Sequence, residues 1–193
     1  MVSNKIKRWK IMMEEVLTHF TEELKNKNYS VIHDEPIPGV RGLIQAVSPK
    51  LTTFGPIKFI NYYLFLDWEN DLFGRLDALI AAQKSFSEVV NKDFRVPHGW
   101  RITLPNIVVA ALSNTPFSHE AISYVQSRYQ IPWLGGEVGQ MMLFDLQARK
   151  MYCHYKKAYK QTGSIPLGYA VDELFGIYKS IYPDARLLVH GEK

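Results

Sequence analysis

Residues 57–75 read IKFINYYLFLDWENDLFGR, and the predicted secondary structure changes within this stretch. Residues 57–68 are mostly apolar, with many branched and aromatic side chains, which predicts the longest strand of the chain. From about Asp71 to Asn91, large apolar residues return at helical spacing with alanines between them, which predicts a helix. The fold prediction and the main site prediction both start from this junction.

Three predicted elements precede the junction. Residues 5–27 form an amphipathic helix, because apolar residues recur every two to four positions along them. Residues 28–36 and 39–49 are two short strands separated by the turn sequence PIPG, and residues 51–56 form a second turn. With the long strand at 57–68, these two strands make an antiparallel meander or a hairpin pair.

The chain after the junction alternates between strands and helices. Residues 106–114, NIVVAALSN, are a continuous apolar run, as expected of a strand buried on both faces. Thr115 and Pro116 then provide a helix N-cap and first turn, for a helix that ends at about Tyr129. Residues 140–155 form a hairpin. The helix between these strands is long enough for a right-handed crossover, so we expect residues 106–114 to run parallel to the first hairpin strand.

A final amphipathic helix lies within residues 166–183. The predicted order is helix-β-β-β-helix-β-helix-β-β-helix, with no linker or repeat to divide residues 1–193 into more than one domain. This order predicts an α/β fold, bordering on α+β: a three-layer domain with a mixed sheet of about five to six strands and flanking helices.

Composition places the chain in a broad class. Hydrophobic residues make up 47% of it and charged residues 22%, which are ordinary values for a globular protein. A single cysteine, Cys153, excludes an internal disulfide framework and fits a reducing compartment. No run approaches the roughly 18 apolar residues of a membrane span, and charges interrupt the N-terminus where a signal peptide would be apolar. We therefore expect a soluble, cytoplasmic protein with no membrane partner.

Three acids, Asp67, Glu69 and Asp71, gather around Trp68 in the opening stretch. In one interpretation they are structural: Asn70 or Asp71 caps the helix, and acids near a helix N-terminus favour its dipole. In the other, Asp67 and Glu69 form a site, because strand geometry puts both on one face and hard divalent cations prefer oxygen ligands. Asp67 and Glu69 are therefore the candidate catalytic and metal-binding residues, with Mg²⁺ or Mn²⁺ as the ion.

The order helix, three-strand meander, helix, strand, helix, strand, over residues 5–146, is similar to the core of restriction-endonuclease-like proteins of the PD-(D/E)XK superfamily. This resemblance implies a Mg²⁺-dependent phosphodiesterase site, with an acid on the second strand and an acid-x-lysine on the third. The third-strand acid falls on Asp67, whereas Glu69 stands where the family has lysine. Gln45 is the only polar side chain between Arg41 and Ser48 on the second strand. The resemblance therefore favours a non-catalytic relative.

Five basic residues and no acid lie between residues 149 and 160, with three tyrosines among them. The candidates for nucleic-acid contact in this segment are Arg149, Lys150, Tyr152, Tyr155, Lys156 and Lys157. Rings that stack on bases beside cations that follow phosphates are typical of single-strand binding. The alternative is a solvated strand end in which lysine stems cover tyrosine rings.

Two functions from different classes remain. The first is an endonuclease-like, largely non-catalytic protein that associates with nucleic acid, for which we expect affinity to fall steeply with salt. The second is a non-enzymatic protein-interaction module or homodimer that uses aromatic surface loops, since interface cores favour the aromatic types abundant here. The net charge of +4 and pI near 9.0 lean only mildly towards acidic partners.

Overall fold

The computed structural model describes residues 2–33, 42–48, 52–54, 57–92, 103–127, 129–130, 138–155 and 165–189. Within these ranges it does not describe the side chains of residues 2–11, 52–54, 57, 129–130, 138 and 165–168. The described helices are α1 (Val2–Asn26), α2 (Leu76–Lys92), α3 (His119–Ser127) and α4 (Ile165–Ile181). The described strands are β1 (Ser30–His33), β2 (Ile44–Val47), β3 (Thr52–Phe54), β4 (Ile57–Asp67), β5 (Thr103–Ser113), β6 (Tyr129–Gln130), β7 (Val138–Asp145), β8 (Lys150–Cys153) and β9 (Arg186–Leu188).

All the described strands belong to one mixed sheet with the order β1-β2-β4-β5-β7-β8-β9. β1, β2 and β4 are antiparallel neighbours, which confirms the predicted meander. β5 runs parallel to both β4 and β7, which confirms the predicted crossover. The short strands β3 and β6 pair with β4 and β7. The predicted α/β class is therefore confirmed.

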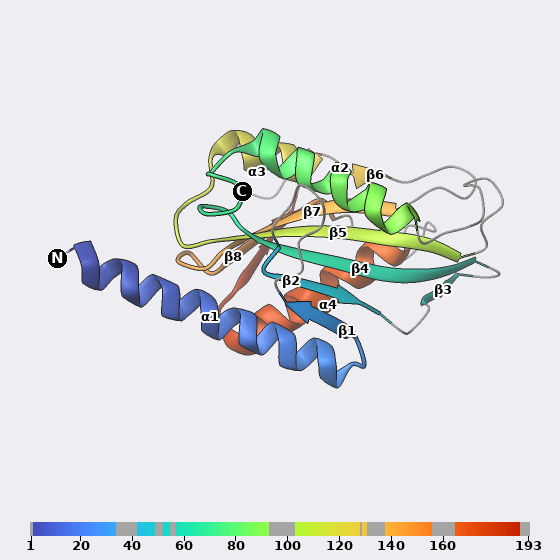
Figure 1. The fold of residues 1–193 in the computed structure, drawn as a ribbon, viewed down its shortest axis with the longest axis horizontal. Helices are drawn as coiled ribbons and strands as arrows, with labels where there is room; N and C mark the ends of the chain where they lie inside the picture. Colours follow the sequence, from blue (N-terminus) through green and yellow to red (C-terminus); the bar gives the residue numbers. More distant parts are fainter. Residues whose placement is uncertain are drawn as a thin grey trace.

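Helices cover both faces of this sheet, with α1 and α4 on one side and α2 and α3 on the other (Figure 1). Strand alternation divides the core in the same way. On β4, Tyr63 and Phe65 pack in the core beneath α1 and α4, whereas Leu64 and Leu66 pack beneath α2 and α3. The central strand β5 is buried on both faces, as its continuous apolar sequence predicted.

Crossover handedness explains which helix lies on which face. α2 joins β4 to β5 and α3 joins β5 towards β7, and these three parallel strands follow one another across the sheet. Two right-handed crossovers in the same direction put both helices on the same face. β8 runs antiparallel to β7, and α4 joins it to its parallel neighbour β9. A right-handed crossover from the reversed strand puts α4 on the opposite face.

The sheet has more strands than the predicted five to six. Residues 51–56, predicted as a turn, contain β3, and β6 and β9 were not predicted. These three strands have two or three residues each. Such short strands show no period, so only their hydrogen-bonding neighbours define them.

α2 begins later than the sequence predicted, at Leu76 rather than at about Asp71. The reason lies in the preceding turn, where Phe73 and Gly74 have φ values of 51° and 67°. Residues with positive φ cannot continue a right-handed helix. The prediction that Asn70 or Asp71 caps this helix is therefore wrong.

α3 also begins later than predicted, at His119. Ser118 is its N-cap, because Ser118 Oγ accepts a hydrogen bond from the N–H of Ala121 at 3.2 Å. The predicted cap at Thr115 is wrong, since Thr115 hydrogen-bonds to a different part of the chain. Across the described residues, no helix is both long enough and apolar enough to cross a membrane.

Candidate functional site

The turn between β4 and α2, residues 67–75, is organised around the carboxylate of Asp67. Asp67 Oδ1 accepts hydrogen bonds from the N–H groups of Glu69 and Asn70, both at 2.9 Å, and Oδ2 accepts one from Asn70 Nδ2 at 2.7 Å. Asp71 Oδ2 accepts a hydrogen bond from the N–H of Asp67 at 2.9 Å, and the N–H of Asp71 donates to the Asp67 carbonyl at 2.9 Å. A carboxylate bonded to backbone N–H groups just ahead of it is an Asx turn. The two aspartates therefore fix the backbone of this turn.

Glu69 joins the turn to the end of the neighbouring strand β5. Its Oε1 accepts hydrogen bonds from the hydroxyls of Ser113 at 2.6 Å and Thr115 at 2.7 Å, and from the N–H of Thr115 at 3.1 Å. These partners lie 44 and 46 residues further along the chain. The turn is therefore held both by its own backbone and by β5.

The turn places two large side chains inward and one outward. Trp68 and Leu72 are buried in the core beneath α2 and α3, and the Trp68 ring meets that of Phe117 edge-on with centroids 5.1 Å apart. Phe73, between them and α2, is 76% exposed. Its φ of 51° lies in the left-handed region, which a bulky L-residue rarely adopts. A rigid turn therefore presents an aromatic ring to solvent.

The metal and catalytic roles of Asp67 and Glu69 stay predictions. Within the part of the chain that the structure describes, no three histidine, cysteine, aspartate or glutamate side chains are grouped so as to hold a metal ion. The carboxylate of Asp67 accepts hydrogen bonds from its own turn, and that of Glu69 accepts them from β5 and the residues after it. A metal ion would have to replace or share these bonds.

The basic segment after β7 is only partly available for contact. Arg149 Nη1 donates hydrogen bonds to both carboxylate oxygens of Asp184, at 2.9 and 2.8 Å, and its guanidinium carbon lies 5.3 Å from the centroid of the Tyr182 ring. Tyr152 is buried, with its ring against that of Phe117. Stacking of Tyr152 on a base would therefore require the core to open.

Lys150 and Tyr155 are partly exposed, and Tyr155 also packs against the core beneath α1 and α4. Lys156 and Lys157 lie outside the described residues. The nucleic-acid role of the whole set stays a prediction. The hairpin prediction for this segment is confirmed, because β7 and β8 pair across a turn at residues 146–149.

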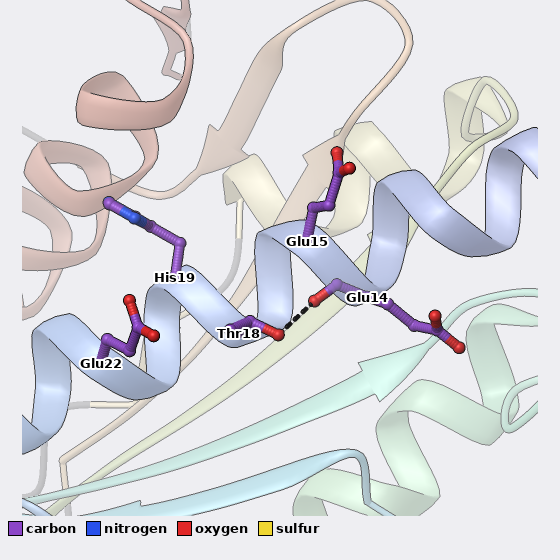
Figure 2. A pocket seen from close by; sticks show the side chains of 5 residues that line it. All are labelled: Glu14, Glu15, Thr18, His19 and Glu22. Atoms are coloured by element: carbon purple, nitrogen blue, oxygen red, sulfur yellow. Dashed lines mark hydrogen bonds between the residues drawn. The ribbon is translucent and has the colours of Figure 1, made fainter.

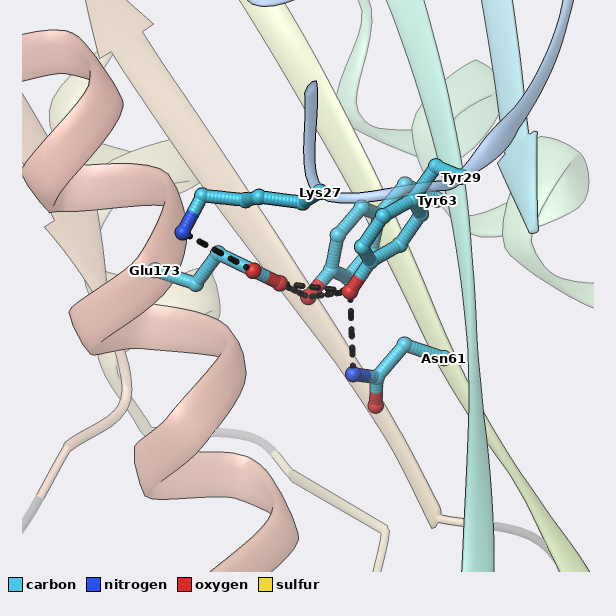
Figure 3. A network of polar contacts seen from close by, with 5 residues as sticks. All are labelled: Lys27, Tyr29, Asn61, Tyr63 and Glu173. Atoms are coloured by element: carbon cyan, nitrogen blue, oxygen red, sulfur yellow. Dashed lines mark hydrogen bonds and ion pairs between the residues drawn. The ribbon is translucent and has the colours of Figure 1, made fainter. Parts of the chain in front are cut away.

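A second polar cluster lies on the opposite face of the sheet, around Glu173 of α4 (Figure 3). Glu173 Oε2 accepts hydrogen bonds from the hydroxyls of Tyr29 at 2.6 Å and Tyr63 at 2.7 Å, and Glu173 Oε1 lies 3.4 Å from Lys27 Nζ. Asn61 Nδ2 donates to the Tyr29 hydroxyl at 3.2 Å. One carboxylate thus joins α4, the end of α1 and β4.

The end of α1 delivers Tyr29 to this cluster. Asn28 has a φ of 63°, its N–H donates to the Lys25 carbonyl at 2.8 Å, and the N–H of Tyr29 donates to the Leu24 carbonyl at 2.9 Å. This pair of bonds is a Schellman motif, which ends a helix in a fixed direction. The Tyr29 and Tyr63 rings then stack with centroids 5.5 Å apart and an interplanar angle of 16°.

Both hydroxyls of this cluster are proton donors at neutral pH. Burial, reinforced by the charge of Glu173, raises the pKa of Tyr29 to about 12. Burial and its two neighbours, Tyr29 and Glu173, raise the pKa of Tyr63 well above its usual value. Protonated hydroxyls can donate hydrogen bonds to the Glu173 carboxylate, which can only accept them. The cluster therefore acts as a clamp between elements.

Sequence reasoning missed both Phe73 and the Glu173 cluster. Phe73 fits the helical spacing of the residues that follow it, which predicts a place for it on the apolar face of that helix. Gly74 beside it was the available signal, since glycine favours the positive φ that ends such a pattern. No local pattern joins Glu173 to Tyr29 and Tyr63, which are 144 and 110 residues away.

Comparisons with known proteins returned no relatives: no family model, no curated protein and no solved structure matches this chain.

Proposed function

We propose that this protein is a protein-interaction module and that Phe73 is the side chain that anchors its partner. The observation that carries the proposal is the combination of exposure, strain and rigidity at this residue. The residue is 76% exposed and its backbone is left-handed, yet hydrogen bonds of Asp67, Glu69 and Asp71 hold the turn that carries it. Rigid aromatic side chains lose little entropy on binding, and they are common binding hot spots.

Magnitudes support an interaction role over a packing role. A left-handed backbone costs a non-glycine residue about 1–2 kcal/mol, and the exposed ring of Phe73 returns little burial energy within the monomer. Burial of a phenylalanine side chain is worth about 1.5–3 kcal/mol, which a partner with a matching apolar pocket would supply. Strained backbone conformations held by their surroundings cluster at functional sites.

Replacement of Phe73 is expected to separate stability from function. In Phe73→Gly the left-handed conformation carries no steric cost, so the free energy of unfolding should rise by about 1 kcal/mol. Phe73→Ala keeps most of the backbone strain and should leave stability nearly unchanged. Urea unfolding followed by circular dichroism measures both. A marked loss of stability in either variant would mean that Phe73 packs within the monomer, contrary to the proposal.

Partner contact is tested with a photoreactive phenylalanine analogue at position 73 in cells that normally make the protein. Irradiation should give one adduct of defined mass. The matched control carries the same analogue at Tyr169, an aromatic residue of α4 that is 56% exposed. Adducts from both positions, or from neither, would contradict a specific role for Phe73.

We propose as a second candidate function that the protein has an endonuclease-like fold, is largely non-catalytic and associates with nucleic acid. The arrangement of the sheet favours it, because the antiparallel strands β1, β2 and β4 followed by parallel β5 and β7 fit the order on which that resemblance rests. Lys150 and Tyr155 would supply accessible contacts beside Lys156 and Lys157.

The wild type is then expected to bind a fluorescent single-stranded oligonucleotide with an affinity that falls as salt rises. Replacement of Lys150, Lys156 and Lys157 by glutamate should abolish binding. The control reverses Lys84 and Lys92, two exposed residues of α2, and should leave binding unchanged. Equal losses in the two variants would indicate a non-specific effect of net charge.

A further inference from the structure

The charges of α1 are divided between its two halves. Residues 1–13 contain four basic residues and no acid: Lys5, Lys7, Arg8 and Lys10. Residues 14–26 contain one basic residue, Lys25, and four acids: Glu14, Glu15, Glu22 and Glu23. The basic half extends past the edge of the sheet, away from the other described elements (Figure 1). Among the described side chains of α1, core contacts run from Met12 to Leu24.

The acidic half borders two hollows that share Glu14, Thr18 and Glu22. One, of about 360 Å³, is also lined by Glu15 and His19 (Figure 2). The other, of about 580 Å³, lies between α1 and the strands β1 and β2. Its remaining lining includes apolar Leu17, Leu43 and Ile44 together with Thr21, Lys25 and His33. The surface beside α1 therefore combines an acidic ridge with an apolar floor.

We propose that this chain forms a dimer in which the basic half of α1 in one copy docks on the surface beside the acidic half of α1 in the other copy. Complementary charge selects this occupant, since residues 5–10 carry only basic charges and the ridge of the receiving surface is formed by carboxylates.

The two interactions form a closed dimer. Because each copy carries both a basic segment and an acidic surface, an antiparallel pair of α1 helices satisfies both at once about a two-fold axis. With the axis between residues 13 and 14, the 1.5 Å rise per residue places Lys5 level with Glu22 of the second copy, and Met12 level with Glu15. Trp68 and Leu72, in the turn that carries Phe73, pack on the face of the sheet beneath α2 and α3, whereas α1 covers the opposite face, so this interface and the proposed partner contact involve different elements.

Charge exchange tests the dimer. The basic-reversed variant carries Lys5→Glu and Arg8→Glu, and the acid-reversed variant carries Glu15→Lys and Glu22→Lys. Sedimentation velocity over a wide range of concentration should show a wild-type dimer that weakens with added salt. Each variant alone should associate at least about tenfold more weakly than the wild type, because like charges then face each other. An equimolar mixture should recover a heterodimer, because both contacts are again between opposite charges.

The control variant carries Lys84→Glu and Lys92→Glu on α2, with the same change in net charge as the basic-reversed variant, and should dimerise like the wild type. Circular dichroism of each variant confirms that it is folded. A monomeric wild type, a mixture that fails to associate, or an equally weakened control overturns the proposal. Binding of a monomeric wild type to vesicles of anionic phospholipid would likewise overturn it and assign the basic half to a lipid surface.

Discussion

Asp67→Ala is expected to lower the free energy of unfolding by about 3 kcal/mol, because backbone N–H groups of the turn lose a charged acceptor. Asp67 is 9% exposed, and its carboxylate accepts hydrogen bonds from the N–H groups of Glu69 and Asn70 and from Asn70 Nδ2. Loss of the side chain leaves these donors without that partner and frees the turn that presents Phe73. Urea unfolding of the variant and the wild type measures the difference.

Asp67→Asn is the matched control, because it keeps an oxygen acceptor of the same shape and removes the charge. It should retain most of the stability that Asp67→Ala loses. The wild type and Asp67→Asn together also test the metal prediction. A cation at about 100 times its dissociation constant would stabilise the folded state by roughly 2.7 kcal/mol. A Mg²⁺-dependent rise in Tm in the wild type, absent in Asp67→Asn, would favour the metal site over the turn. Wild-type stability in Asp67→Ala would contradict the structural role.

Glu173→Ala should also destabilise the protein by about 3 kcal/mol, because two buried tyrosine hydroxyls then lose the acceptor that they share. Tyr29 and Tyr63 each donate to Glu173 Oε2, and Lys27 lies beside Oε1. Glu173→Gln retains an oxygen acceptor and gives up only the partly exposed ion pair with Lys27. Its free energy of unfolding should therefore fall by only about 1 kcal/mol. Thermal and urea unfolding measure the three proteins under identical conditions.

A coupling measurement separates this explanation from a simple loss of packing. Tyr29→Phe with Tyr63→Phe removes the donors, and in that background Glu173→Ala should cost much less than in the wild type. The reduction follows because a buried hydrogen bond removed from both sides leaves no unpaired group. Additive losses would show that Glu173 stabilises α4 through packing alone and would contradict the clamp.

The long elements of the fold could be predicted from sequence because each carries its own periodic signal. β4 is mostly apolar, β5 contains a continuous apolar run, and the four helices have apolar residues at helical spacing. The parallel pairing of β5 with β7 followed from the length of the intervening helix. The start of α2 could not be predicted correctly from sequence, because Phe73 satisfies the helical spacing although its backbone is left-handed. At such a position turn geometry outweighs periodicity.

The candidate site was harder to predict because its residues serve two kinds of chemistry equally well. An acid at the end of a strand can hold a cation or accept bonds from the turn that follows, and only the position of its neighbours separates these uses. For Asp67 the neighbours are local, but for Glu69 they lie beyond α2, at Ser113 and Thr115. No single-sequence pattern brings those residues together.

The long separation between Tyr63 and Glu173 also has a consequence for synthesis of the chain on the ribosome. Glu173 follows Tyr63 by 110 residues and Tyr29 by 144, and it lies on α4, the last of the described helices. A nascent chain that is complete through β8 already contains the strands β4, β5 and β7. It does not yet contain α4, so the part of the sheet face that α4 covers is still exposed. Until Glu173 emerges from the ribosome, the hydroxyls of Tyr29 and Tyr63 have no Glu173 carboxylate to donate to. The apolar residues around them are then accessible to chaperones. The clamp therefore closes late in synthesis, after the strands β1 to β8 have all been made.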